Sequence, residues 1–157
     1  MSPFPPLAEG ETTLSDSTEV LLRSVHPSWV DQGKPTSLAF KPTGKDAGCL
    51  SVARSTVVTP QEHFDEFTGH LGLSSDGIWG VSVDEVQSAS SRAIDDQLSS
   101  SRPDPCPRGH SYVDYRDLDT GGAIKSRARV LLAAAVYRGP LFDKSDAGSL
   151  IPKSAAS

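Results

Sequence analysis

Arg23 and His26 are the first residues whose chemistry stands out, because they lie in an otherwise strand-forming run, EVLLRSVHPSW. In a strand, successive side chains point to opposite faces, so Arg23 shares a face with Leu21 and Val25, whereas His26 lies on the other face. Only a bulge or the bend before Pro27 would bring the two together. A guanidinium on an apolar face needs a structural partner or the anionic group of a ligand.

Two groups of residues have spacings that could hold a metal ion. His63, Glu66 and His70 are separated by three and four positions, so they share one stripe of a helix. They do not form the HExxH pattern of zinc proteases, which favours a solvated helix face. Cys106 and His110 are a second pair, but the sequence contains no CxxC motif beside them. We therefore predict no metal site.

A basic run, Lys125, Arg127 and Arg129, lies in the longest helical pattern of the chain. Spacings of two distribute these side chains around a helix, which favours a solvated surface. The alternative is a weak RNA-binding module, or a contact with an acidic protein, through this last helix. The three residues therefore stay candidate binding residues.

A polar turn, FKPTGKD, lies between two strand-like patterns. Phe40, Thr43, Lys45 and Asp46 give it an unusual density of side-chain chemistry for a turn. It is either a stiff connector or the rim of a binding site. We include these four residues, with Arg23, among the candidate binding residues.

The elements that must position these residues alternate between strand-like and helix-like patterns. β-branched residues and period-two alternation predict strands over 20–25, 50–58, 77–83 and 110–116. Capping residues predict helices that begin after Thr59, Asp84 and Thr120, the second running through Gln97 and the last ending at Gly139. We expect an α+β fold with four to five strands, in a mostly antiparallel or mixed sheet, packed by two to three helices.

A length of 157 residues favours a single compact domain. Residues 1–18 are rich in Pro, Ser, Thr and acidic residues and predict a disordered acidic tail. The domain is expected to span 19–139, with a flexible, proline-rich loop at 98–109. Residues 140–157 predict a flexible C-terminal tail.

The charge balance and the cysteine content limit the possible function classes and the cellular compartment. The net charge is −5, and because four of the 20 acidic residues lie in 1–19, the rest carries 16 acidic and 15 basic side chains. This balance argues against a dedicated nucleic-acid binder. Two cysteines, Cys49 and Cys106, suit a reducing compartment. Without a signal-peptide pattern or a long apolar segment, we expect a cytoplasmic protein that does not contact the membrane.

The segments LLRSVHP, TSLAFKPTGKDAGCLSV, GIWGVSV and VDYRDL resemble the recurring blocks of a family of small bacterial proteins. The resemblance covers about Val20 to Gly139. No activity is established for that family, so the resemblance implies no functional residue.

The chain is also faintly similar to ADP-ribosyltransferases of the Arg-Ser-Glu type, on the order of Arg23, Ser55, Thr56 and Glu85. The resemblance implies that Arg23 would hold a phosphate of NAD, the hydroxyls would orient the nicotinamide side, and Glu85 would stabilise the ribosyl cation. The chain departs from the family because no Glu or Gln lies two residues before Glu85.

No catalytic motif is recognisable in the sequence, so an enzyme is neither predicted nor excluded. The leading hypothesis is a small binding or accessory protein that acts with a protein partner and uses no cofactor. The alternatives are the NAD-dependent ADP-ribosyltransferase and the RNA-binding module.

Overall fold

The computed structural model describes residues 3–147. Its strands are β1 Thr12–Thr13, β2 Val20–Val25, β3 Val30–Asp31, β4 Lys34–Pro35, β5 Cys49–Arg54, β6 Gly77–Ser82, β7 Ala93–Asp95, β8 His110–Asp114 and β9 Phe142–Asp143. Its α-helices are α1 Pro60–Asp65, α2 Val83–Ser88, α3 Gly121–Arg138 and α4 Lys144–Ala147. Short helical turns are η1 Pro27–Trp29, η2 Ser37–Phe40, η3 Gly44–Asp46 and the π-helical η4 Glu66–His70.

Seven strands form one antiparallel sheet in the order β1-β7-β8-β5-β2-β6-β9, and β3 and β4 form a separate ribbon. The predicted α+β class and the single compact sheet are confirmed, but the predicted four to five strands were too few. Two of the additional strands, β1 and β9, have two residues each, and they lie in the segments predicted to be tails. Strands this short carry no periodic pattern that a sequence could reveal.

The third additional strand, β7, lies inside the stretch 84–97 that the sequence predicts to be helical. Helix α2 is capped by Ser82, whose hydroxyl accepts from the Glu85 backbone N–H, and it ends at Ser88. Ser90 then adopts a positive φ of 62°, which breaks the helical path. The chain leaves in an extended conformation and pairs with β8.

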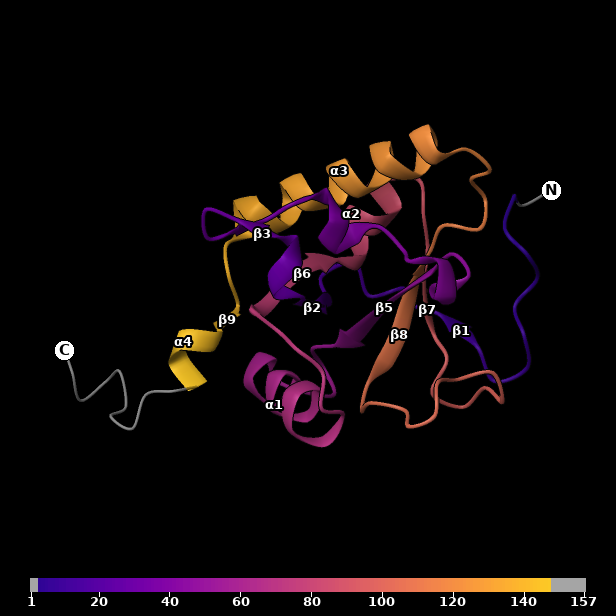
Figure 1. Cartoon of the computed structure of the whole chain (residues 1–157). Helices are drawn as coiled ribbons and strands as arrows, with labels where there is room; N and C mark the ends of the chain where they lie inside the picture. The colour runs from indigo at the N-terminus through magenta and orange to yellow at the C-terminus, as the bar shows by residue number, and fades with distance from the viewer. Residues whose placement is uncertain (1–2, 148–157) are drawn as a thin grey trace.

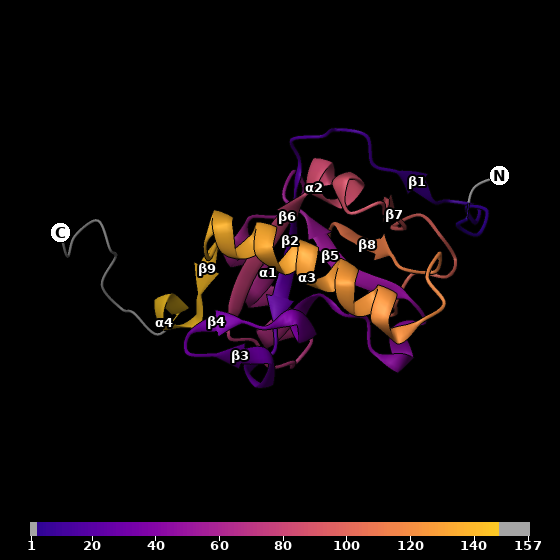
Figure 2. The ribbon, with the colours of Figure 1, turned by 90° about the horizontal axis from the view of Figure 1, so that it is seen from above.

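One face of the sheet is covered by α3, which crosses above it in Figure 1 and runs obliquely over it in Figure 2. Leu21 and Val25 of β2 and Leu50 and Val52 of β5 point to this face and pack in the larger apolar core. The buried residues that α3 contributes to that core are Ala128, Leu131 and Ala135. Their spacing of three and four places them on one stripe of the helix.

The opposite face is only partly covered, by α1 and η4 (Figure 1). Phe64 of α1 packs there on Leu22, Ala53 and Ile78 in a smaller cluster. Helix α1 begins at the predicted capping box, in which Thr59 and Glu62 satisfy each other's backbone N–H groups. Ser51 and His110, which are polar residues of this face, therefore border a cavity.

Residues 3–18, which belong to the segment predicted as an acidic tail, pack along the sheet edge. They contribute β1 and the buried side chain of Leu14, and Glu11 accepts a hydrogen bond from the Tyr112 hydroxyl. At the other end, residues 148–157 of the predicted tail 140–157 lie outside the described residues. Among residues 3–147, no helix combines the length and the apolarity needed to cross a membrane.

Candidate active site

Pairing of β5 with β8 places a serine and a histidine side by side on the face opposite α3. Leu50 and Val52 point toward α3, so Ser51 between them points away from it. Ala53 is the register partner of His110, and Ser51 is therefore its diagonal neighbour on the same face. Nε2 of His110 lies 3.1 Å from Oγ of Ser51, which is hydrogen-bond distance.

A carboxylate completes this arrangement from the next strand. Asp96 directly follows β7, the neighbour of β8, and its Oδ1 lies 2.7 Å from Nδ1 of His110. His110 and Asp96 are both buried, with exposed fractions of 6% and 5%. A carboxylate oxygen accepts, so this contact favours the neutral tautomer of His110 that carries its proton on Nδ1 and leaves Nε2 to accept from the Ser51 hydroxyl. We call Ser51, His110 and Asp96 the relay.

The relay opens into two adjoining hollows. The first cavity has a volume of about 420 Å³, and its wall includes Phe67, Leu71 and Leu73 from the α1 and η4 side and three prolines of the loop 98–109. The second cavity, of about 490 Å³, is more polar and is bounded by the N-terminal segment. Ser51, His110, Lys45 and Pro103 line both cavities. Ser51 thus borders both spaces.

Arg23 reaches the first cavity where β2 and β5 separate. The ladder between these strands has two register pairs, ending at Leu22 and Ala53, whereas β2 and β6 form six. Beyond that end, Nη1 of Arg23 donates to the Ser51 carbonyl at 2.9 Å, and its Nε donates to the Ala39 carbonyl at 2.7 Å. Arg23 is 8% exposed, and burial lowers its pKa to about 10, so the guanidinium keeps its charge at neutral pH.

Trp29 contacts both residues that the sequence singled out first. The guanidinium carbon of Arg23 lies 5.3 Å from the centroid of the Trp29 ring. The centroid of the His26 ring lies 5.7 Å from that of Trp29. His26 is itself exposed and accepts from the Ser28 backbone N–H, which caps η1. The bend before Pro27 thus brings both to one aromatic side chain, although Arg23 and His26 start on opposite faces of β2.

His63 of α1 forms part of the wall of the first cavity. It is 6% exposed, and its Nδ1 has no hydrogen-bond partner among the described residues. Burial lowers the pKa of His63 to about 4, and repulsion from His110 and Arg23 adds to the shift. The imidazole is therefore neutral at pH 7. It lies near the relay without carrying charge.

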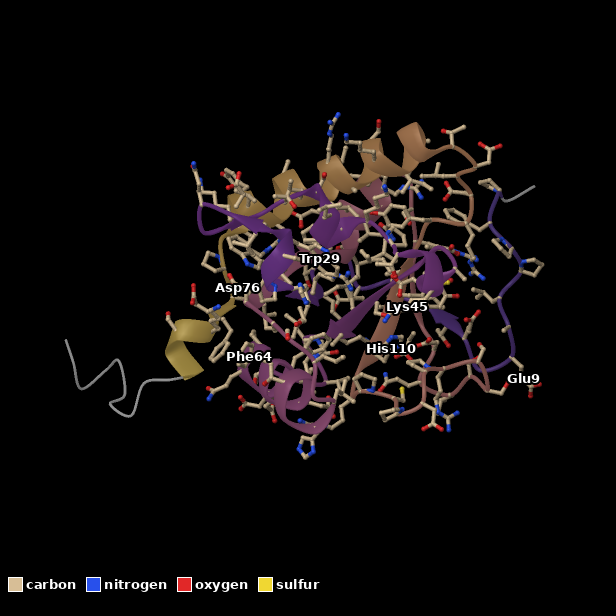
Figure 3. The ribbon with its side chains drawn as sticks, viewed as in Figure 1. Glu9, Trp29, Lys45, Phe64, Asp76 and His110 are labelled. Carbon is tan, nitrogen blue, oxygen red and sulfur yellow. The ribbon has the colours of Figure 1, made fainter. Side chains whose placement is uncertain are left out.

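The predicted polar turn contributes one residue to both cavities. Lys45 is exposed and lines both cavities, and Figure 3 shows it close to His110. Asp46 lines the second cavity and accepts from the backbone N–H and the hydroxyl of Thr43, which makes the turn stiff. Phe40 is fully buried in the core, so its side chain does not form a rim.

The residues of the ADP-ribosyltransferase resemblance do not gather in the first cavity. Its lining includes Arg23 but neither Ser55 nor Glu85. Glu85 completes the cap of α2 and forms an ion pair with Arg138 at 2.7 Å. The Thr56 hydroxyl donates to Glu19. Glu85 and Thr56 therefore have structural partners outside the cavity.

The basic run on α3 separates into two environments. Lys125 and Arg129 are exposed, whereas Arg127 is buried and holds Asp117 through two hydrogen bonds of 2.6 and 2.7 Å. Arg127 therefore anchors α3 to the rest of the domain and is not available to a nucleic acid.

Within residues 3–147, no three His, Cys, Asp or Glu side chains are grouped so that they could hold a metal ion. Glu66 accepts from the Arg108 backbone N–H, and His110 belongs to the relay. Cys49 and Cys106 are free thiols.

The sequence did not reveal Ser51 or Asp96, and it indicated His110 only as a partner of Cys106. The available signal was a polar residue in each of two predicted strands, Ser51 in CLSVAR and His110 in HSYVD. Their pairing depends on the strand order. In comparisons with family models, curated proteins and solved structures, we found no match to this chain.

Proposed function

We propose that the protein is a hydrolase in which Ser51 is the nucleophile, His110 the general base and acid, and Asp96 the residue that orients His110. One observation carries this proposal. The hydrogen-bonded relay joins the three side chains at 3.1 and 2.7 Å, and Ser51 and His110 open into a cavity of about 420 Å³. A serine that is hydrogen-bonded to a histidine, which a carboxylate in turn orients, is the arrangement that activates a serine hydroxyl on many unrelated folds.

The proposed reaction is the hydrolysis of an ester. Oγ of Ser51 attacks the carbonyl carbon, and its proton moves to Nε2 of His110. The bond between that carbon and the leaving oxygen breaks, His110 gives the proton to the leaving oxygen, and the acyl group remains on Ser51. Water then attacks the acyl carbon, again losing a proton to His110, and releases a carboxylic acid and free Ser51. Asp96 stabilises the imidazolium that forms in each step.

A fluorophosphonate probe tests the nucleophile directly. Ser51 would attack phosphorus, fluoride would leave, and the peptide that contains Ser51 would gain the mass of the phosphonyl group. We expect labelling of the wild type and none of Ser51→Ala. In His110→Gln the labelling rate should fall at least about 10³-fold, because the hydroxyl loses its base. Ser55→Ala removes a hydroxyl beyond the end of the same strand and should label like the wild type.

Release of 4-nitrophenolate from 4-nitrophenyl acetate measures turnover in the same variants. Asp96→Asn should lower kcat by about 10³- to 10⁴-fold, because the wrong imidazole tautomer would be favoured. Equal labelling and turnover in wild type and Ser51→Ala would contradict the proposal. Circular dichroism of each variant establishes that a loss of activity is not a loss of fold.

The functions suggested by the sequence alone stay predictions. A protein partner, NAD as a cofactor and RNA binding through α3 have no specific support in the geometry of the cavities. The hydrolytic reaction requires no cofactor, and Arg127, one of the three basic residues predicted to bind RNA, is paired with Asp117.

A further inference from the structure

Arg23 differs from the other arginines that are removed from solvent. Among the described residues, every other buried or half-buried arginine has a carboxylate oxygen within 3.0 Å, namely Arg54, Arg92, Arg116, Arg127 and Arg138. The hydrogen bonds of Arg23 go to two neutral carbonyls. Asp46 attracts it from beyond ion-pair distance and is itself bonded to Thr43. A buried charge without a counter-charge is costly unless a ligand supplies one.

Lys45 adds a second positive charge to the wall of the same cavity. It is exposed, and it forms no ion pair with a described residue. Neutral His63 contributes to this wall a buried nitrogen that has no hydrogen-bond partner within residues 3–147. Asp96 belongs to the relay, but it lines the second cavity and not the first. The first cavity thus presents positive charge to whatever enters it.

The remainder of the first cavity is apolar. Phe67, Leu71 and Leu73 line it together with three prolines of the loop 98–109, and Leu73 is 48% exposed. Apolar walls with a few convergent polar groups are typical of sites for small molecules. A ligand that satisfies both features carries its negative charge at one end and an apolar body at the other.

We propose that the substrate of this site is an amphiphilic oxyanion, a molecule whose carboxylate or phosphate binds to Arg23 and Lys45 while its apolar body packs against Phe67, Leu71 and Leu73. In calling the ligand a substrate, this inference rests on the proposed hydrolase function. The binding itself does not depend on turnover. Arg23 positions the substrate beside Ser51, because its guanidinium is already bonded to the Ser51 carbonyl.

Calorimetric titration of the Ser51→Ala protein tests binding without catalysis. The probes are 4-phenylbutyrate, phenyl phosphate and the neutral 4-phenylbutanamide. We expect at least one of the two anions to bind about 10- to 100-fold more tightly than the amide, because a charge-assisted hydrogen bond replaces a neutral one. The anion that binds more tightly distinguishes a carboxylate from a phosphate substrate. Equal affinity for the amide and both anions would overturn the inference.

Two substitutions locate the anion. Lys45→Ala lies on an exposed turn and should weaken binding of the preferred anion about threefold to tenfold without affecting the fold. Arg23→Met keeps the apolar stem and should abolish the preference for the anion. Lys34→Ala removes an exposed lysine of β4, outside both cavities, and is the matched control. Each substitution is made in the Ser51→Ala protein. The inference is wrong if Lys45→Ala, like Lys34→Ala, leaves the affinity for the anion unchanged and Arg23→Met also folds and binds the anion equally tightly.

The two proposals fail in different ways. Anion binding without any labelling of Ser51 would support the oxyanion site and contradict the hydrolase function. Labelling of Ser51 and turnover, together with equal affinity for the amide and the anions, would support the hydrolase function and contradict the oxyanion substrate.

Discussion

Arg23 and Arg127 are buried to the same degree, but the protein compensates their charges differently. Arg127, on α3, is 6% exposed and binds both carboxylate oxygens of Asp117, as well as three backbone carbonyls. Arg23, at the cavity, is 8% exposed; its hydrogen bonds go to carbonyls alone, and the neutral ring of Trp29 lies beside it. A paired buried charge holds two elements together, whereas an unpaired one beside a cavity is available to a ligand.

The largest expected effect comes from removing the paired charge. Arg127→Met leaves the Asp117 side chain, which is 8% exposed, without its partner and should lower the free energy of unfolding by about 3 to 5 kcal/mol. Arg23→Met leaves two carbonyls without a donor but removes an uncompensated charge, so its cost should be smaller, about 1 to 3 kcal/mol. Urea denaturation measures both. Arg129→Met, at an exposed position of the same helix, is the control and should change stability by less than about 0.5 kcal/mol.

The comparison would fail if Arg23→Met were as destabilising as Arg127→Met. That outcome would mean that the fold already compensates the charge of Arg23. There would then be no reason to expect an anionic ligand in the first cavity.

A second prediction concerns the pH dependence of the cavity wall. His63 has a pKa of about 4 in the folded protein and 6.5 as its ordinary value, so the unfolded chain takes up a proton first as the pH falls. Stability should therefore be lost between about pH 6.5 and pH 4, by an amount on the order of 2 to 3 kcal/mol. The measurement is the difference in unfolding free energy between wild type and His63→Leu across this range. Parallel curves for the two proteins would contradict it.

The parts of the fold that the sequence predicts are those with a local signal. The strands at 20–25 and 77–82 carry β-branched residues, and Thr59 and Thr120 cap helices where their patterns require it. Strands β1, β7 and β9 have two, three and two residues, which is too short for a periodic pattern. They form because an edge of the sheet offers unpaired backbone groups, and this is a property of the assembled sheet.

The candidate site divides in the same way. Arg23 and Lys45 stand out locally, one as a charge on an apolar face and the other in a polar turn. The relay does not, because its members come from three separate segments: Ser51 and His110 are 59 positions apart, and His110 and Asp96 are 14 apart. Only the strand order β7-β8-β5 brings them together. A serine and a histidine in two strands are unremarkable until that order is known.

The smallest predicted effect compares two capping boxes of the same kind. Thr59→Ala and Ser82→Ala each remove the hydroxyl that accepts a backbone N–H at the start of a helix, and each should cost about 1 kcal/mol. Helix α1 carries His63 at the first cavity, whereas α2 does not line it. Thr59→Ala should therefore also speed hydrogen exchange over 60–70 and weaken binding of 4-phenylbutyrate by the Ser51→Ala protein. An equal loss of binding in Ser82→Ala would show that the cavity responds to global stability and not to its own wall.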